Sequence, residues 1–185
     1  YGQSDLEASL DAYLRGLQGY PTLTIWWNHL LYGQPPAGLN IRTSLDLKLQ
    51  RIADEMLSGH LGSLVLINAE NGEILVMSSH PNYDANRLEA QWEELIRDPA
   101  SPLLNRATLG SYPIGDLEQR LSPEGIAKYQ LDNTPLIRIP YTSPKQMDDS
   151  SWRLSPLHMS LLAATISNEG VRPAPILVTA VDTPL

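Results

Sequence analysis

The middle of the chain carries two short apolar runs, residues 63–68 and 73–78, that have the length and composition of β-strands. Residues 69–72 join them, and Asn71 with Gly72 supplies the positive φ angles that a tight hairpin needs. Both runs are apolar on both faces. We therefore expect a central antiparallel hairpin covered by helices on each side, which is an α+β fold.

Apolar residues at helical spacing predict the helices that flank this hairpin. They cover residues 4–17, 46–57, 88–97 and 155–169. In the second of these helices the expected inward face consists of Leu45, Leu49, Ile52, Ala53 and Met56. The last helix has Ser155 as its cap and Pro156 at its first position, and it is apolar nearly all round, so we expect it to be buried. Two further strands are predicted over residues 39–45 and 175–181.

The segment 22–32 is apolar and contains Trp26 and Trp27, and a turn or stiff linker rich in Gly and Pro follows it at residues 33–38. The residue pattern of this segment does not decide whether the two Trp side chains pack in the core or lie on the surface. Two adjacent Trp residues usually place one ring in a core and leave the other partly exposed. The alternative is a surface that binds a partner, because Trp is enriched at interfaces.

The composition is that of a globular protein and excludes several classes of partner. Of the 185 residues, 42% are apolar and 18% are charged, and 13 Lys and Arg against 21 Asp and Glu give a net charge of -8. No basic patch is available to neutralise a phosphate backbone, so we expect no nucleic acid partner. The chain has no Cys, and its longest apolar stretches are far shorter than a membrane helix requires.

No cofactor or metal site is expected from the spacing of the polar residues. The chain has no phosphate-binding Gly-rich loop with a Lys. Its four histidines, His29, His60, His80 and His158, lie in separate predicted elements, so we interpret them as surface or turn residues. Asp84, in the Asn-rich turn at residues 82–86, is expected to cap backbone N–H groups.

Five groups of segments, in chain order, resemble the transpeptidase domain of penicillin-binding proteins, especially the monofunctional type that also carries a dimerisation domain. The groups are residues 1–7 with 14–16; residues 43–46 with Gln50; residues 69–78 (AENGEILVMS) with 81–86 (PNYDAN); residues 102–108 (PLLNRAT) with 112–115 (YPIG); and residues 155–159 (SPLHM). The resemblance implies a reduced form of this serine β-lactamase-like fold, with an antiparallel sheet flanked by helices. It also implies that residues 1–37 form an N-terminal helix and linker at the end of a dimerisation-type region, followed by a transpeptidase-like domain at residues 38–185.

The same resemblance indicates that the catalytic residues are missing. The family's acyl transfer needs a Ser nucleophile and a Lys three residues later on a helix, where the amine takes the hydroxyl proton. Residues 116–119 (DLEQ) occupy that position, and the whole chain contains no Ser-x-x-Lys, Ser-x-Asn, Lys-Thr-Gly or Lys-Ser-Gly. Residues 126–129 and 134–140 resemble a segment that the family reaches much later. We therefore expect that the catalytic helical part has been deleted; the family's Lys-Thr-Gly strand would follow Leu185.

These observations favour a non-catalytic scaffolding or partner-binding role in bacterial cell-wall assembly, with other assembly proteins or a second copy of the chain as partner. Tyr112, Asp116 and Gln119 are the predicted remnant of the active-site slot, although Asp116 with Gln119 also has the pattern of an ordinary helix cap. A divergent enzyme that uses Asp116, Glu118 or His80 as acid or base is one alternative. A sensor that binds a peptidoglycan fragment or β-lactam without covalent chemistry is another.

The resemblance also implies a location. We expect the protein at the extracytoplasmic face of the bacterial plasma membrane, tethered by an upstream anchor outside the given sequence. The absence of Cys and of an initiating Met is compatible with this location.

Overall fold

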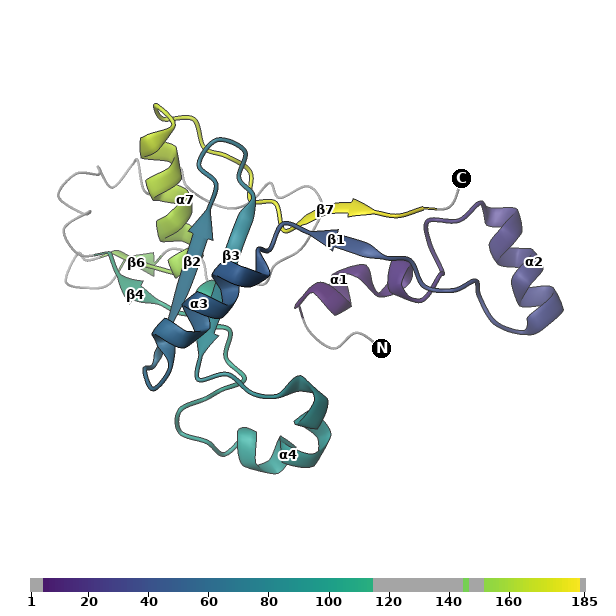
Figure 1. Cartoon of the computed structure of the whole chain (residues 1–185), viewed down its shortest axis with the longest axis horizontal. Coiled ribbons are helices and arrows are strands. Elements are labelled where there is room, and N and C mark those ends of the chain that lie inside the picture. The colour runs from purple at the N-terminus through teal and green to yellow at the C-terminus, as the bar shows by residue number, and fades with distance from the viewer. Residues whose placement is uncertain (1–4, 115–144, 147–151, 184–185) are drawn as a thin grey trace. The chain divides into compact units, whose positions relative to one another are not determined.

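A computed structural model of the chain describes residues 5–114, 145–146 and 152–183 (Figure 1). By their contacts these residues divide into two compact units. Unit 1 contains residues 5–44 and 176–183, and unit 2 contains residues 45–114, 145–146 and 152–175. This division follows packing alone. The assignment of residues 1–37 and 38–185 to two parts of a larger family architecture stays a prediction.

Unit 1 joins the two ends of the chain through a pair of antiparallel strands. Its elements are α1 (Asp5–Leu14), α2 (Thr22–Tyr32), β1 (Ile41–Thr43) and β7 (Val178–Val181). Ile41 lies opposite Val181 in the β1–β7 pair, and the backbone N–H of Ser44 donates to the carbonyl oxygen of Leu177 at 3.0 Å. Both strands are shorter than the predicted ranges 39–45 and 175–181, because the pairing covers only this part of each range.

Unit 2 contains the predicted hairpin and its covering helices (Figure 1). Its elements are α3 (Leu47–Leu57), β2 (Gly62–Ile67), β3 (Ile74–His80), the 3-10 helix η1 (Ala85–Arg87), α4 (Leu88–Leu95), α5 (Arg106–Leu109), β4 (Tyr112–Pro113), β5 (Lys145–Gln146), β6 (Trp152–Leu154) and α7 (Pro156–Ser167). The hairpin is confirmed, since β2 and β3 pair antiparallel from Gly62 opposite His80 to Ile67 opposite Ile74. In a second sheet, β6 lies between β4 and β5. None of the helices in the described ranges is long and apolar enough to cross a membrane.

The hairpin turn depends on Gly72 for two reasons. Its φ of +81° lies in the left-handed region, which side chains disfavour. A Cβ at this position would also lie 1.9 Å from the carbonyl oxygen of Ala174. The turn is closed by the backbone N–H of Asn68, which donates to the carbonyl oxygen of Glu73 at 2.9 Å. Of the predicted Asn-Gly pair, Gly72 has a positive φ and Asn71 does not, so the expectation for Asn71 is wrong. Gly72 is in addition a packing contact.

Helix α3 contacts the hairpin through polar side chains. The amide of Gln50 accepts from the backbone N–H of Met77 at 3.1 Å and donates to the carbonyl oxygen of the same residue at 3.3 Å. Asp54 accepts a hydrogen bond from the hydroxyl of Ser78. Asp46, expected as the first residue of the helix, instead caps it by accepting from the backbone N–H groups of Lys48 and Leu49.

The predicted inward face of α3 is therefore mostly wrong. Ala53 is buried, but Leu49, Ile52 and Met56 are exposed. The reason is that β3 presents a backbone N–H and C=O which need partners, and an amide side chain satisfies both groups at once.

Helix α7 packs on the hairpin, as predicted, but only with one face. Its contacts with β2 are extensive. The side chains on its buried face are Leu157, His158, Leu161, Leu162, Ala164 and Thr165. Ala163 and Ile166 are exposed, which corrects the expectation that the helix is buried all round. Leu162 of α7 forms a buried cluster with Ile114 and Leu154, against which Met159 packs.

Removing the Leu162 side chain should destabilise the protein strongly. Leu162 is 1% exposed, so Leu162→Ala should lower the free energy of unfolding by about 2–5 kcal/mol through lost burial and the cavity left behind. Ile166, on the same helix, is 53% exposed, and Ile166→Ala should change it by less than about 0.5 kcal/mol. Urea unfolding followed by circular dichroism measures both. Equal losses in the two variants would contradict the described orientation of α7.

Candidate functional site

The segment that leads to the predicted active-site slot is held in place by Arg106. This side chain is buried, and its guanidinium donates to the carbonyl oxygen of Ser101 at 3.0 Å and to that of Ala100. The backbone N–H of Arg106 donates to the hydroxyl of Ser79 at 2.9 Å, and this hydroxyl donates to the carbonyl oxygen of Leu104 at 3.1 Å. Backbone dipoles thus solvate the buried cation, and β3 fixes the position of the loop.

Gly110 then allows the chain to turn closely into β4. A Cβ at this position would lie 2.3 Å from the carbonyl oxygen of Arg106 and 2.5 Å from the ring of Tyr112. Such contacts cannot be accommodated without moving the backbone or the ring. The close approach at Gly110 therefore sets where Tyr112 lies.

Strand β4 is anchored to β6 and through it to α7. Tyr112 lies opposite Leu154 and Pro113 opposite Arg153. The guanidinium of Arg153 donates to the carbonyl oxygen of Ser111. Ile114, the last described residue before the slot, belongs to the buried cluster with Leu154. The chain thus reaches the slot from a packed and hydrogen-bonded support.

Of the predicted slot residues, the structure describes one. Tyr112 is half-buried on β4. Asp116, Glu118 and Gln119 lie outside the described residues, as do residues 126–129 and 134–140, so the predictions that rest on them stay predictions. His80, the third acid or base candidate, is at the end of β3 and is half-buried.

A serine and a histidine that the sequence interpretation did not connect lie together at the start of α7. The hydroxyl oxygen of Ser155 is 2.7 Å from Nδ1 of His158 and accepts the backbone N–H of His158 at 3.3 Å. His158 is 4% exposed, which corrects its interpretation as a surface or turn residue. The three-residue spacing after a cap Ser is the signal that could have indicated this contact.

A hydroxyl beside an imidazole is also the arrangement that activates nucleophilic serines. In this pair, however, the geometry indicates a structural role. Ser155 is 1% exposed, and its oxygen already caps α7. A substrate carbonyl could not reach it. Burial, and secondly the positive charge of Arg172, lower the pKa of His158 to about 4 from its usual 6.5, so the ring is neutral at pH 7.

The other polar groups do not form a metal site within the ranges that the structure describes. No three His, Asp or Glu side chains come together there as ligands would. Asp84 has the predicted capping role, accepting the backbone N–H of Asn86 at 3.0 Å at the start of η1.

Comparison with known proteins identifies relatives of this segment. No protein-family model matches the chain. It is 32% identical over 122 residues to the peptidoglycan D,D-transpeptidase MrdA of Escherichia coli K12, an alignment that covers 60% of this chain and 19% of that protein. It is 35% identical over 131 residues to the peptidoglycan D,D-transpeptidase PbpA of Mycolicibacterium smegmatis, covering 62% of this chain and 26% of that protein. The chain thus corresponds to a minor part of each relative.

Solved structures share the fold over most of the chain. The penicillin G acyl-enzyme complex of penicillin-binding protein A from M. tuberculosis superposes with a TM-score of 0.75 at 22% identity, over 100% of this chain and 64% of that one. The D,D-transpeptidase domain of a peptidoglycan glycosyltransferase from Eggerthella lenta gives 0.67 at 18% identity, over 99% of this chain and 63% of that one. The complex of penicillin-binding protein PBP2 with MreC from Helicobacter pylori gives 0.62 at 17% identity, over 82% of this chain and 47% of that one.

The described fold is therefore that of a penicillin-binding-protein transpeptidase domain, which confirms the predicted α+β class. In sequence, the chain is similar to part of the peptidoglycan D,D-transpeptidases MrdA and PbpA.

The buried neutral His158 should make the protein less stable as the pH falls. Its pKa is lower in the folded chain than in the unfolded chain, so its contribution is fully present above about pH 6.5 and is lost as the pH falls towards 4. Between pH 7 and pH 5 this loss should be about 2 kcal/mol. Urea unfolding at the two pH values measures it. His158→Asn should remove this component, whereas His60→Asn, at an exposed position, should keep it. An unchanged pH dependence in His158→Asn would contradict the burial of a neutral ring.

Proposed function

We propose that the chain is a non-catalytic member of the family, with a scaffolding or partner-binding role in peptidoglycan assembly. The observation that carries the proposal is the absence of every catalytic signature from the 185-residue sequence, although the described fold is that of the transpeptidase domain. The position that resembles the family's Ser-x-x-Lys has Asp116 and Gln119 instead.

These two residues cannot perform the acyl transfer by the family's mechanism. A carboxylate at the start of a helix is stabilised in its ionised form, and an anhydride formed from it would be short-lived. The amide of Gln119 cannot take a proton from a neighbouring nucleophile. Neither residue therefore replaces the serine or the lysine.

The described packing is consistent with a binding role, because the residues that lead to the predicted slot form a packed and hydrogen-bonded support. The guanidinium of Arg106, the close approach at Gly110 and the cluster around Leu154 direct the chain into β4. Selection that acts only on folding and contacts preserves such a framework without preserving a nucleophile. The complex of PBP2 with MreC shows that a protein with this fold takes a protein partner, which is consistent with a role in cell-wall assembly.

A labelled penicillin should leave no covalent adduct on this chain. Acylation needs a Ser Oγ whose proton is taken by a neighbouring base, and neither is provided at residues 116 and 119. Intact-protein mass spectrometry measures the result, with penicillin-binding protein A from M. tuberculosis as the positive control because it forms a penicillin G acyl-enzyme. The mass of one opened β-lactam on the unmodified chain would contradict the proposal. Saturable binding of the penicillin without an adduct would favour the alternative in which the chain is a sensor that binds β-lactams non-covalently.

The double variant Asp116→Ser with Gln119→Lys should also remain unlabelled. It restores the nucleophile and its first base, but the groups from the other two signatures stay absent, and catalytic groups that act as a unit are strongly non-additive. An adduct on the double variant alone would mean that substitution, and not deletion, removed the activity.

The proposed role places the protein outside the plasma membrane, tethered by a segment beyond the given sequence, because peptidoglycan is assembled there. Fractionation of cells that express the full-length protein should recover it with the membranes, and extraction should require detergent. Recovery of the intact protein in the cytosol would contradict this location.

A further inference from the structure

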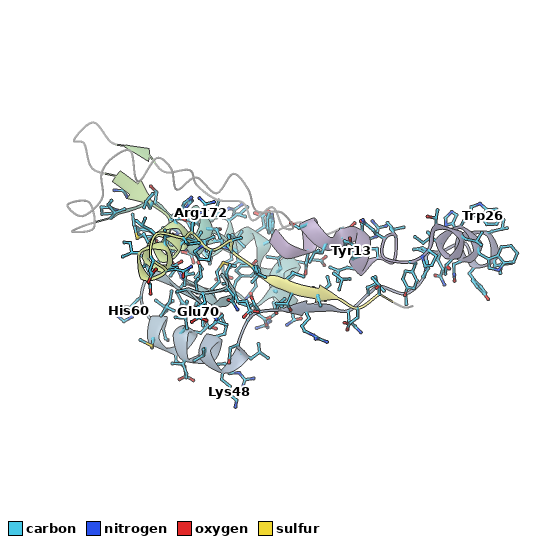
Figure 2. The ribbon with its side chains drawn as sticks, turned by 90° about the horizontal axis from the view of Figure 1, so that it is seen from above. Tyr13, Trp26, Lys48, His60, Glu70 and Arg172 are labelled. Atoms are coloured by element: carbon cyan, nitrogen blue, oxygen red, sulfur yellow. The ribbon has the colours of Figure 1, made fainter. Side chains whose placement is uncertain are left out.

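Helix α2 presents its apolar stripe outward. Leu23, Trp26, Trp27 and Leu30 have the i, i+3, i+4, i+7 spacing by which a helix normally packs on a core. All four are exposed, Trp26 by 55% and Trp27 by 51%. Figure 2 shows Trp26 on this helix with its side chain pointing away from the ribbon.

The less exposed side of α2 is the more polar one. Thr24, Ile25 and Asn28 are half-buried, and the side-chain amide of Asn28 donates to the carbonyl oxygen of Thr24 at 2.9 Å. The amphipathic order of a surface helix is thus reversed. Such an arrangement exposes apolar area that water disfavours, so it is expected where a second surface covers the helix.

The stripe is also preorganised. The rings of Trp26 and Trp27 are in contact, with centroids 5.9 Å apart. Helix α2 ends at Gly33, whose left-handed conformation directs its N–H to the carbonyl oxygen of His29 at 3.0 Å. A short helix with a fixed end and a paired aromatic surface loses little conformational entropy on binding.

The stripe reads the same in both directions. Leu23, Trp26, Trp27 and Leu30 form the pattern Leu-x-x-Trp-Trp-x-x-Leu. A two-fold axis between Trp26 and Trp27 therefore brings each Leu23 against Leu30 of a second chain, and each Trp26 against Trp27. An interface in which residue i contacts j while j contacts i is the requirement for a symmetric dimer.

The distribution of charge favours the same partner. The chain has a net charge of -8, but no Asp, Glu, Lys or Arg lies between Arg15 and Arg42. Two copies can therefore meet at this segment without placing like charges in contact. Interfacial membrane helices instead carry Lys and Arg along their polar face, and α2 has none.

A second exposed stripe, on α3, does not share these properties. It consists of Leu49, Ile52 and Met56 and has no aromatic residue. The exposed charged side chains of Arg51 and Glu55 lie beside it.

We propose that the stripe Leu23–Trp26–Trp27–Leu30 of α2 is a self-association surface, on which two copies of this chain pair with their α2 helices antiparallel. The inference rests on the proposed binding role, and it identifies a second copy of the chain as one partner. Sedimentation and penicillin labelling measure separate properties, so either can fail without the other.

The contact is small. A half-exposed aromatic ring contributes roughly 100 Å², so the stripes of two copies remove roughly 800 Å² in total, below the size of a standard stable interface. The dimer is therefore weak, with dissociation in the micromolar range.

Sedimentation equilibrium of the 185-residue chain tests the association. At about 100 μM the weight-average mass should approach twice the 20.5 kDa of one chain and fall on dilution. Trp27→Glu should sediment as a monomer. Trp92→Glu, on α4 and 47% exposed in the starting chain, should sediment like the unchanged protein. A monomer at every concentration overturns the proposal, and so does equal dissociation by the two substitutions. If the chain is monomeric and binds to vesicles of phosphatidylethanolamine and phosphatidylglycerol, the α2 stripe contacts a lipid bilayer and the proposal is overturned.

Disulfide formation tests the antiparallel register, because the chain has no Cys of its own. Two chains of different mass, one with Leu23→Cys and one with Leu30→Cys, should form a mixed disulfide on mild oxidation. Either variant alone should crosslink much less, because its own position on the paired helix lies roughly 10 Å away along the axis, beyond disulfide reach. Crosslinking of each variant to itself, without the mixed product, would overturn the antiparallel arrangement.

Discussion

The β2–β3 hairpin can exist only because helices and a loop cover both of its faces. Two strands alone are marginally stable in water, and this pair is apolar on both sides. On one face of β3, Ile74 and Val76 are fully buried in line with Ser78, which bonds to Asp54 of α3. From the other face Ser79 bonds to the loop before α5. The positions of α3 and of the loop before α5 are therefore set by their contacts with the two faces of this hairpin.

The position of Tyr112, the described residue of the predicted slot, depends on the hairpin through a short series of contacts. Ser79 holds the backbone at Arg106, whose guanidinium holds the loop before it, and Gly110 then turns the chain into β4. Arg106 and Arg153 both donate to backbone carbonyl oxygens, so the cations beside this path are solvated by fixed dipoles. These contacts involve backbone groups and the side chains of Ser79, Arg106 and Arg153, so they do not depend on which residues occupy positions 116 and 119.

The proposed non-catalytic role would leave folding and surface contacts as the properties that selection maintains. In unit 1, helix α2 offers such a surface, because Trp26 and Trp27 are exposed whereas Thr24 and Asn28 are half-buried. The helix would be more soluble with these residues exchanged. The proposed self-association would remove this apolar area from water.

The sequence by itself determined the features that arise from neighbouring residues. The hairpin with Gly72 in its turn, the cap at Ser155 and the resemblance to the penicillin-binding-protein fold follow from period, turn chemistry and the order of the segments. The roles of Asp116 and Gln119 remain predictions from sequence alone.

Only the tertiary structure decided which way the elements face. The helical period predicted that the apolar stripe of α3 faces the hairpin. Instead Gln50 faces it and bonds the backbone of β3, and the apolar stripe is exposed. The burial of His158, the exposure of Trp26 and Trp27 and the pairing of β1 with β7 were equally unavailable from local pattern. The physical reason is that period and caps are set within a few residues, whereas the face that becomes buried depends on which donors, acceptors and apolar surfaces distant segments bring to it.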